Sequence, residues 1–309
     1  MLKTFSKVEK LMGNRFEISV VSDDEVWANE KITRAIDEIK RIEQLLTTFS
    51  ADSQTNQINE NAGIKPVKVD KEVFDLVERS LRISSLTQGA FDITYGSIDK
   101  SLWNFDTQMT TLPEPSVALK MVELIDYQKV VLNPAESSIF LQAKGMRIGF
   151  GGIGKGYAAE MAKRLMIREG VKSGIVNASG DLTTWGLQPD GRQWTIGIAD
   201  PNYKNRPFSY LNISNMAVAT SGNYEKYVII EGKRYSHTIN PKTGFPVTGI
   251  KSVTIISPNA EIADALATPV TVMGVRVGLD LINQLKGIAC IIIDDNNKMF
   301  TSKNINIKS

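Results

Sequence analysis

The stretch EIADALATPV, residues 261–270, decides the fold class, because it resumes a helical pattern after a long block of short strands. The apolar helical pattern spans residues 259–286, and Pro269 within it is expected to kink or split the helix. Residues 171–256 before it read as short strands and turns. Helices and antiparallel-looking strands in separate blocks, without βαβ alternation, are typical of the α+β class. The sequence therefore predicts an α+β fold.

Asp264 stands inside this apolar run, and Thr268 follows four residues later. Positions four apart share one face of a helix, so the carboxylate and the hydroxyl can point at one object. A buried carboxylate is costly unless it has a hydrogen-bond partner, a cation or a metal ion. One carboxylate with one hydroxyl suits a hard ion such as Mg²⁺, which takes oxygen ligands and usually holds phosphates. The alternative is that Asp264 caps a helix or pairs with a lysine.

Helical patterns also occupy earlier segments, namely residues 23–50, 70–90, 115–125 and 155–170. In the first of these, apolar residues recur at helical spacing and are expected on one buried side: Val26, Ile32, Ile36, Ile39, Ile42 and Leu45 or Leu46. Residues 50–63 are polar and read as turns. Residues 137–152 suggest a hairpin, and residues 287–302 suggest another with an Asp-Asn-Asn turn.

Composition and charge narrow the possible partners. Among 309 residues, 36 Lys and Arg stand against 34 Asp and Glu, for a formal net charge of +2. This balance gives no electrostatic reason to expect nucleic acid or an anionic membrane. The single cysteine, Cys290, excludes an intrachain disulfide and a cysteine-cluster zinc site. It lies in an apolar, strand-like run, so a buried structural thiol is expected.

The N-terminus, MLKTFSKVEKLMGNRFEIS, lacks the apolar core of a secretory signal. No apolar run reaches the length that a transmembrane helix needs. We therefore expect a soluble, cytoplasmic chain without a membrane span. A periplasmic or membrane-anchored location is the alternative if a leader has been removed.

The segment GFGGIGKGYAAE, residues 149–160, passes from a strand end through glycines into a helix that carries Lys155. Glycines let backbone N–H groups approach an anion, and a helix N-terminus with a lysine favours phosphate. The Walker A spacing fails at Gly156, and the dinucleotide pattern G-x-G-x-x-G fits but is weak alone. The alternative is a tight packing turn with a surface lysine.

Three further segments contain glycine turns that could line a site or be purely structural. They are NASGDLTTWG (177–186), AVATSGNYEKY (217–227) and YSHTINPKTGFPV (235–247). The last holds the only histidine, His237, so a histidine-based zinc site and Ser-His-Asp chemistry are disfavoured. His237 is expected at a strand end before a turn, where ligand-binding side chains are often displayed.

Taken together and in order, these segments resemble the ApbE family, the FAD:protein FMN transferases. The resemblance rests on MGNRFEI, FSADSQTNQIN, GAFDITYG, GGIGKGYAAE, ASGDL, WTIGIADP, AVATSGNYEKY, HTINPKTGFPV and ADALATPVTVMG. It implies one unit over residues 1–309, with a bilobed, T-fold-like α+β architecture of mixed or antiparallel sheets and flanking helices. It also implies a cleft for FAD and Mg²⁺ between two intimate lobes.

The resemblance implies roles for individual residues. Asp264, Thr268 and the backbone carbonyl near Gly152 match the metal ligands. Asp264, His237 and Lys155 are the candidate catalytic residues, with Lys155 beside the phosphates. Contacts to FAD are expected from Met12, Phe49, Ala90, Phe91, Asp92, Lys155, Asp181, Ser221, Gly222 and His237.

The chain departs from the family pattern at three positions. Gly149 stands where the family usually has Asp, and Ser179 stands where a glycine is usual. Phe49 occupies a place where tyrosine is common, so stacking on a flavin or adenine ring is preserved while a hydroxyl contact is lost. None of these changes removes a predicted metal ligand.

The resemblance implies that a Thr or Ser hydroxyl of an acceptor flavoprotein attacks the FMN-side phosphorus of FAD and that AMP leaves. Mg²⁺, Lys155 and backbone amides are expected to hold the diphosphate and stabilise its charge. Asp264 or His237 is the expected proton acceptor. The alternatives are an FAD pyrophosphatase that gives FMN to water and a non-catalytic FAD-binding protein.

Overall fold

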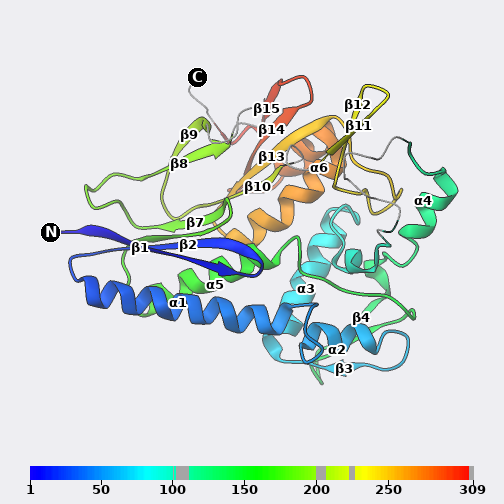
Figure 1. Ribbon diagram of the computed structural model, residues 1–309, viewed down its shortest axis with the longest axis horizontal. Helices are drawn as coiled ribbons and strands as arrows, with labels where there is room; N and C mark the ends of the chain where they lie inside the picture. The colour runs from blue at the N-terminus through cyan, green and yellow to red at the C-terminus, as the bar shows by residue number, and fades with distance from the viewer. Residues whose placement is uncertain (100, 102–110, 200–206, 223–226, 306–309) are drawn as a thin grey trace.

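The computed structural model describes residues 1–99, 101, 111–199, 207–222 and 227–305 (Figure 1). An eight-stranded sheet forms its centre. In spatial order its strands are β1 (Lys3–Leu11), β2 (Asn14–Ser22), β6 (Gly174–Ala178), β7 (Asp181–Trp185), β10 (Ala217–Gly222), β13 (Ile250–Ser257), β14 (Ala289–Asp294) and β15 (Met299–Thr301). Neighbouring strands are antiparallel throughout. The predicted α+β class is confirmed.

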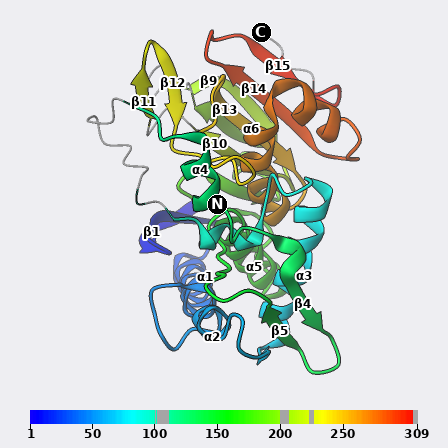
Figure 2. The same ribbon diagram turned by 90° about the vertical axis from the view of Figure 1, so that its right-hand side faces the viewer.

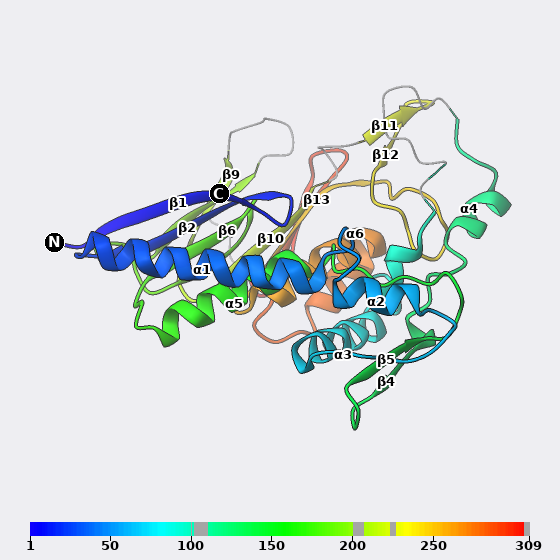
Figure 3. The ribbon, with the colours of Figure 1, turned by 60° about the horizontal axis from the view of Figure 1, so that its bottom comes forward.

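Helices α1 (Glu25–Leu46), α5 (Gly154–Arg168) and α6 (Ala260–Ile282) pack along one face of this sheet (Figures 1 and 3). In α1 the predicted stripe is largely right, because Ile32, Ile36, Ile39, Ile42 and Leu46 are buried. Val26 is the exception and is 81% exposed, because it stands two residues before the buried Ala28 and so lies on the opposite side of the helix.

The other face of the sheet carries the hairpin of β8 (Trp194–Ala199) and β9 (Pro207–Ile213). Residues of β8 form a second apolar cluster with sheet residues such as Leu182 and Val218. Neighbouring sheet residues face opposite sides, because successive side chains of a strand alternate. Cys290 is buried in the main core, as predicted for a structural thiol, while its neighbour Ile291 belongs to the second cluster.

A second group of elements lies beyond the ends of the three helices (Figures 1 and 2). It comprises α2 (Gln54–Glu60), β3 (Val67–Lys68), α3 (Lys71–Leu86), η1 (Ile93–Ser97), α4 (Pro115–Met121), η2 (Tyr127–Lys129), β4 (Val130–Asn133) and β5 (Ser138–Leu141). Strands β3, β5 and β4 form a small antiparallel sheet. The hairpin of β11 (Tyr227–Ile230) and β12 (Lys233–Ser236) lies near α4 (Figure 2). The division into two lobes stays a prediction.

The hairpin predicted over residues 137–152 is wrong, because only β5 within it is a strand and its partners are β3 and β4. The side chain of Asn59 takes the place of a second strand. Its Oδ1 accepts from the Ile148 N–H at 2.7 Å, and its Nδ2 donates to the Ile148 carbonyl at 3.1 Å. Asn59 belongs to α2, a helix in residues that read as turns, where the Ser53 hydroxyl accepts from the Asn56 N–H as an N-cap.

Helix α6 continues through Pro269 and leaves helical geometry at Gly274, where φ is 81°. The expected break at Pro269 is therefore wrong in position. Proline removes one hydrogen bond, whereas glycine at positive φ lets the backbone change direction without steric cost. Helix α6 is long and apolar enough to cross a membrane, a test that core helices of globular proteins also pass. Its first half is largely buried against the sheet and α5.

Arg79 of α3 holds the first turn of α6. Its Nε and Nη2 donate to the Glu261 carboxylate at 2.6 and 3.2 Å, and the Glu261 side chain is only 5% exposed. We expect Arg79→Ala to lower the free energy of unfolding by about 2 kcal/mol, because it leaves a buried carboxylate without its cation. Denaturant unfolding measures the change. Arg82→Ala is the matched control, because it breaks an exposed ion pair with Glu78 and should lower the free energy of unfolding by at most about 0.5 kcal/mol. Equal losses of stability in the two variants would contradict the prediction.

Candidate functional site

The N-terminus of α5 and the first half of α6 meet at Gly156. A Cβ added there would lie 2.2 Å from the Ala260 carbonyl oxygen and 2.6 Å from the Asp264 Cβ. Only glycine therefore permits this approach of the two helices. The contact brings the Lys155–Gly156 backbone, which follows the glycine-rich loop, directly against the predicted metal ligand.

Asp264 is buried and accepts a hydrogen bond from the Gly156 N–H at its Oδ2, at 2.9 Å. Burial and the nearby Asp181 carboxylate raise the pKa of Asp264 to about 7, while Lys155 and the Gly156 N–H oppose this shift. The carboxylate therefore lies where a cation would compensate for lost hydration. Asp264 thus caps the first turn of α5 through the Gly156 N–H, as the alternative interpretation of the sequence had it, and Lys155 lies close enough to act on its charge.

Asp181 connects Lys155 to the sheet. Its Oδ2 forms an ion pair with Lys155 Nζ, and its Oδ1 accepts from the Thr220 N–H at 3.0 Å. Asp181 opens β7 after a turn in which Ser179 has φ 52° and Gly180 has φ 103°. The left-handed conformation at Ser179 explains why glycine would suit that position. Lys155 and Asp181, separated by 26 residues in sequence, are thus brought together at one site.

The residues predicted as metal ligands each supply an oxygen atom, as a hard cation requires. Thr268 is half-buried one turn further along α6, and Gly152 lies in the loop that leads into α5. A carboxylate, a hydroxyl and a backbone carbonyl form the kind of oxygen set that Mg²⁺ takes. Within the described residues no cluster of three or more His, Cys, Asp or Glu could hold a metal. The site would therefore depend on the hydroxyl and the carbonyl as well as on Asp264.

Met12 and Phe91 lie against the same glycine-rich loop. A Cβ on Gly154 would be 3.6 Å from Met12 Cε, and a Cβ on Gly152 would be 3.4 Å from Phe91 Cε2. Met12 occupies the turn between β1 and β2 with φ 52°. Two predicted FAD contacts from distant parts of the chain therefore converge on the start of α5.

Asp92 is buried beside Ala90, but protein donors already occupy its carboxylate. Oδ1 accepts from the Thr94 N–H and hydroxyl at 2.8 and 2.6 Å, and Oδ2 accepts from the Tyr127 N–H at 3.0 Å. Burial raises the pKa of Asp92, and these hydrogen bonds oppose the rise. Its present contacts shape the turn after α3, so any contribution to FAD binding would come on top of a structural role.

The remaining predicted residues lie at the surface or beside it. Phe49, after α1, is 98% exposed. Ser221 and Gly222 end β10 and are half-buried. His237 is exposed just after β12, on a loop whose Ile239 N–H donates to the Tyr95 hydroxyl of η1 at 3.4 Å.

Sequence reasoning missed two backbone donors, the N–H groups of Gly156 and Thr220. Gly156 appeared only as the position where the Walker A spacing fails, and Thr220 only within a segment, residues 217–227, that contains a glycine turn. A pair of small residues on facing helices, Gly156 and Ala260, is a signal that could have indicated close packing. It does not indicate which helices face each other.

The chain is similar to proteins of one known family in sequence and in structure. The sequence model of the ApbE family matches residues 12–292. The chain is 31% identical over 302 residues to a FAD:protein FMN transferase of Klebsiella pneumoniae (strain 342), covering 97% of this chain and 92% of the relative. The crystal structure of the ApbE protein from Thermotoga maritima is similar at a TM-score of 0.86 and 28% identity, covering 97% of each chain. The apo form of the Pseudomonas stutzeri flavinyl transferase ApbE is similar at 0.85 and 25% identity, covering 98% of this chain and 95% of that one.

Proposed function

The chain belongs to the ApbE family, and from this premise we propose that it transfers FMN from FAD to a Thr or Ser hydroxyl of an acceptor flavoprotein, with Mg²⁺ as cofactor and release of AMP. The observation that carries the proposal is the convergence of Lys155, Asp181 and Asp264 at the glycine-rich start of α5. A lysine, helix N–H groups and a carboxylate with neighbouring oxygen donors suit a metal-bound diphosphate. The FAD cleft is proposed to lie between the two predicted lobes.

In the proposed reaction the acceptor oxygen forms a bond to the FMN-side phosphorus, and the bond from that phosphorus to the bridging oxygen breaks, so AMP leaves with the electron pair. Bound Mg²⁺ supplies Lewis-acid stabilisation of the diphosphate charge. Asp264, Thr268 and the Gly152 carbonyl would hold the ion. Lys155, itself positioned by Asp181, would hold the phosphates during the transfer.

The proton of the attacking hydroxyl goes to His237 or Asp264. As a metal ligand, Asp264 is a weak candidate for this role, because a bound cation would oppose the rise in pKa that burial causes. His237 is exposed on the loop after β12 and can meet an acceptor protein. A transfer without a dedicated base is the third possibility, and His237→Ala with a retained rate would favour it.

The test mixes the protein with FAD, Mg²⁺ and a flavoprotein acceptor that has a target threonine, then reads flavin fluorescence on the acceptor in a denaturing gel. We expect a fluorescent acceptor and free AMP in equal amounts. Free AMP and FMN with a dark acceptor, tested across several acceptors, would replace the proposal by an FAD pyrophosphatase. Intact FAD throughout would replace it by an FAD-binding protein.

Phe49 is predicted to stack on FAD. A fully exposed phenylalanine contributes little to the fold, so Phe49→Ala should leave the unfolding midpoint unchanged. We expect the KM for FAD to rise by about fivefold, because an aromatic stack contributes about 1 kcal/mol, with kcat little changed. Phe49→Tyr is the control and should keep the wild-type KM or lower it. An unchanged KM in the alanine variant would remove Phe49 from the site.

A further inference from the structure

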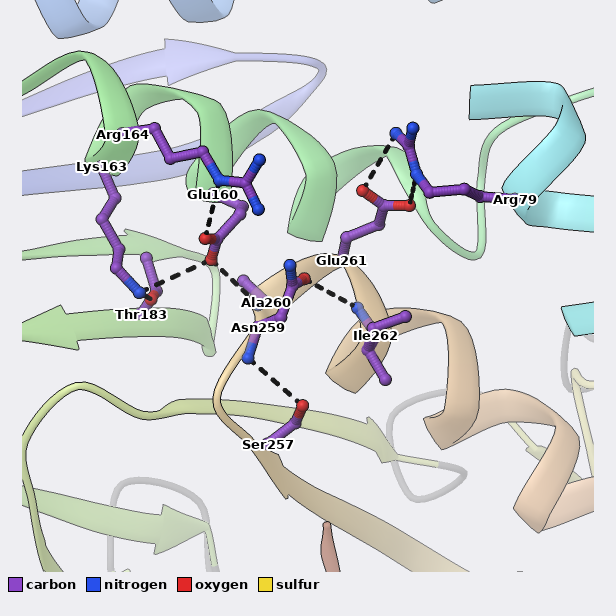
Figure 4. A network of polar contacts seen from close by, with 10 residues as sticks. All are labelled: Arg79, Glu160, Lys163, Arg164, Thr183, Ser257, Asn259, Ala260, Glu261 and Ile262. Carbon is purple, nitrogen blue, oxygen red and sulfur yellow. Dashed lines mark hydrogen bonds and ion pairs between the residues drawn. The ribbon is translucent and has the colours of Figure 1, made fainter. Parts of the chain in front are cut away.

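Glu160 and Gly156 lie four residues apart on one face of α5, and each contacts α6. Gly156 N–H donates to Asp264, while Glu160 Oε2 accepts from the Ala260 N–H at 3.2 Å (Figure 4). Ala260 and Asp264 are likewise four residues apart. Two antiparallel helices are therefore joined by two hydrogen bonds, one turn apart on each helix. The bond from Gly156 holds the predicted metal ligand Asp264, and the bond from Ala260 to Glu160 has no assigned role.

Glu160 is only 4% exposed, and its carboxylate is held by several groups. Arg164 Nε donates to Oε1 at 3.2 Å, and Lys163 Nζ lies 3.6 Å from Oε2 and donates to the Thr183 hydroxyl at 3.2 Å (Figure 4). This network joins α5, the sheet and α6. Two cations of α5, Lys163 and Arg164, lie on the one carboxylate of Glu160 and hold it in position to accept the Ala260 N–H.

The Ala260 N–H is one of the first N–H groups of α6, which have no partner inside the helix. A carboxylate there also interacts favourably with the helix dipole. Two contacts of this turn are local, since the Asn259 side chain accepts from the Ile262 N–H and the Ser257 hydroxyl accepts from the Asn259 N–H (Figure 4). A third, the ion pair of Glu261 with Arg79, ties the turn to α3. The hydrogen bond to Glu160 ties it to α5.

We propose that Glu160 is a positioning residue, whose hydrogen bond to the Ala260 N–H holds α6 so that Asp264 stays beside Lys155 and Gly156 in the geometry that binds the metal. The proposal rests on the proposed function, because it assumes that Asp264 ligates Mg²⁺. Asp264 lies about 6 Å along the helix from Ala260. Any slide of α6 on α5 therefore displaces the carboxylate by the same amount.

Two matched variants separate the effect of the length of the Glu160 side chain from the effect of its charge. Glu160→Asp keeps the charge but retracts the carboxylate by one methylene, and Glu160→Gln keeps the reach but loses the charge. Mn²⁺ replaces Mg²⁺ as a spectroscopic probe, and the resonance signal of free Mn²⁺ reports binding, first without and then with FAD. We expect Glu160→Asp to weaken Mn²⁺ binding by about tenfold or more, as loss of an outer-shell partner does. Glu160→Gln should stay within about threefold of the wild type.

Glu169→Gln, at the C-cap of α5, is the control. It removes ion pairs to Lys31 and Arg34 of α1, so it can lower stability but should leave Mn²⁺ affinity unchanged. Equal affinity of Glu160→Asp and the wild type would overturn the inference, as would a Glu160→Gln variant as weak as Glu160→Asp. Wild-type protein that binds no Mn²⁺ with or without FAD would instead overturn the metal site of the proposed function, and the inference with it.

Discussion

Asp264→Ala is expected to abolish Mg²⁺-dependent transfer of FMN, with a fall in rate of at least about 10³-fold. A metal that stabilises charge on a phosphoryl group contributes several kcal/mol to the transition state, and each 1.4 kcal/mol is about tenfold in rate. Alanine removes the carboxylate from the predicted metal ligands. The measurement is the initial rate of flavin fluorescence on the acceptor at several Mg²⁺ concentrations. An undiminished rate would show that the metal assignment is wrong.

Asp264→Asn and Thr268→Ala are the companions of this variant. Asparagine keeps an oxygen that can accept from the Gly156 N–H but loses the charge, so we expect a folded protein with almost no turnover. The hydroxyl of Thr268 is half-buried and has no hydrogen bond within the described residues. Its removal should change stability by less than about 0.5 kcal/mol while raising the Mg²⁺ concentration needed for half-maximal rate. A loss of rate without this shift in Mg²⁺ requirement would point to misfolding.

Elements that depend on local pattern could be predicted from the sequence. The stripe of α1 repeats at helical spacing from Ile32 to Leu46, and the core strands alternate or run apolar, so burial follows from the order of residues alone. The hairpin of β14 and β15 was likewise visible, since polar turn residues separate its strands. At the first turn of α1 the expectation failed for Val26, because it stands six residues before Ile32, whereas positions on one face of a helix are three, four or seven residues apart.

Elements that depend on distant partners could not be predicted in this way. Residues 146–150 look like a strand, yet the Asn59 amide binds Ile148 in place of a neighbouring strand. The same holds at the site. Local pattern marked Asp264 as a carboxylate in need of a partner, but it could not reveal that the partner would be a backbone N–H on another helix. The family resemblance identified the candidate residues, and the structure adds the contacts of Lys155, Asp181 and Asp264.

Gly156→Ala adds one methyl group near the site, and we expect it to lower the stability of the protein more than any other single methyl group added there. Alanine normally stabilises a helix interior by about 1 kcal/mol relative to glycine. Here the new Cβ would lie 2.2 Å from the Ala260 carbonyl oxygen and 2.6 Å from the Asp264 Cβ, both on α6. Neither atom can move by a change of rotamer, so the helices must separate. Overpacking of this kind costs about 3 kcal/mol or more, and the net loss of stability should be about 2 kcal/mol.

Gly151→Ala is the matched control for stability, because a Cβ there would meet nothing within 4 Å and φ is not positive. We expect its unfolding midpoint to stay near the wild type, whereas that of Gly156→Ala should fall by several degrees, at about 2 to 4 °C for each kcal/mol. Separation of α5 from α6 also breaks the Gly156 hydrogen bond to Asp264, so Mn²⁺ affinity should fall in the folded Gly156→Ala protein. An alanine at Gly156 with wild-type stability and affinity would mean that the two helices can part without disturbing the site, and the close contact would then lose its role in placing Asp264.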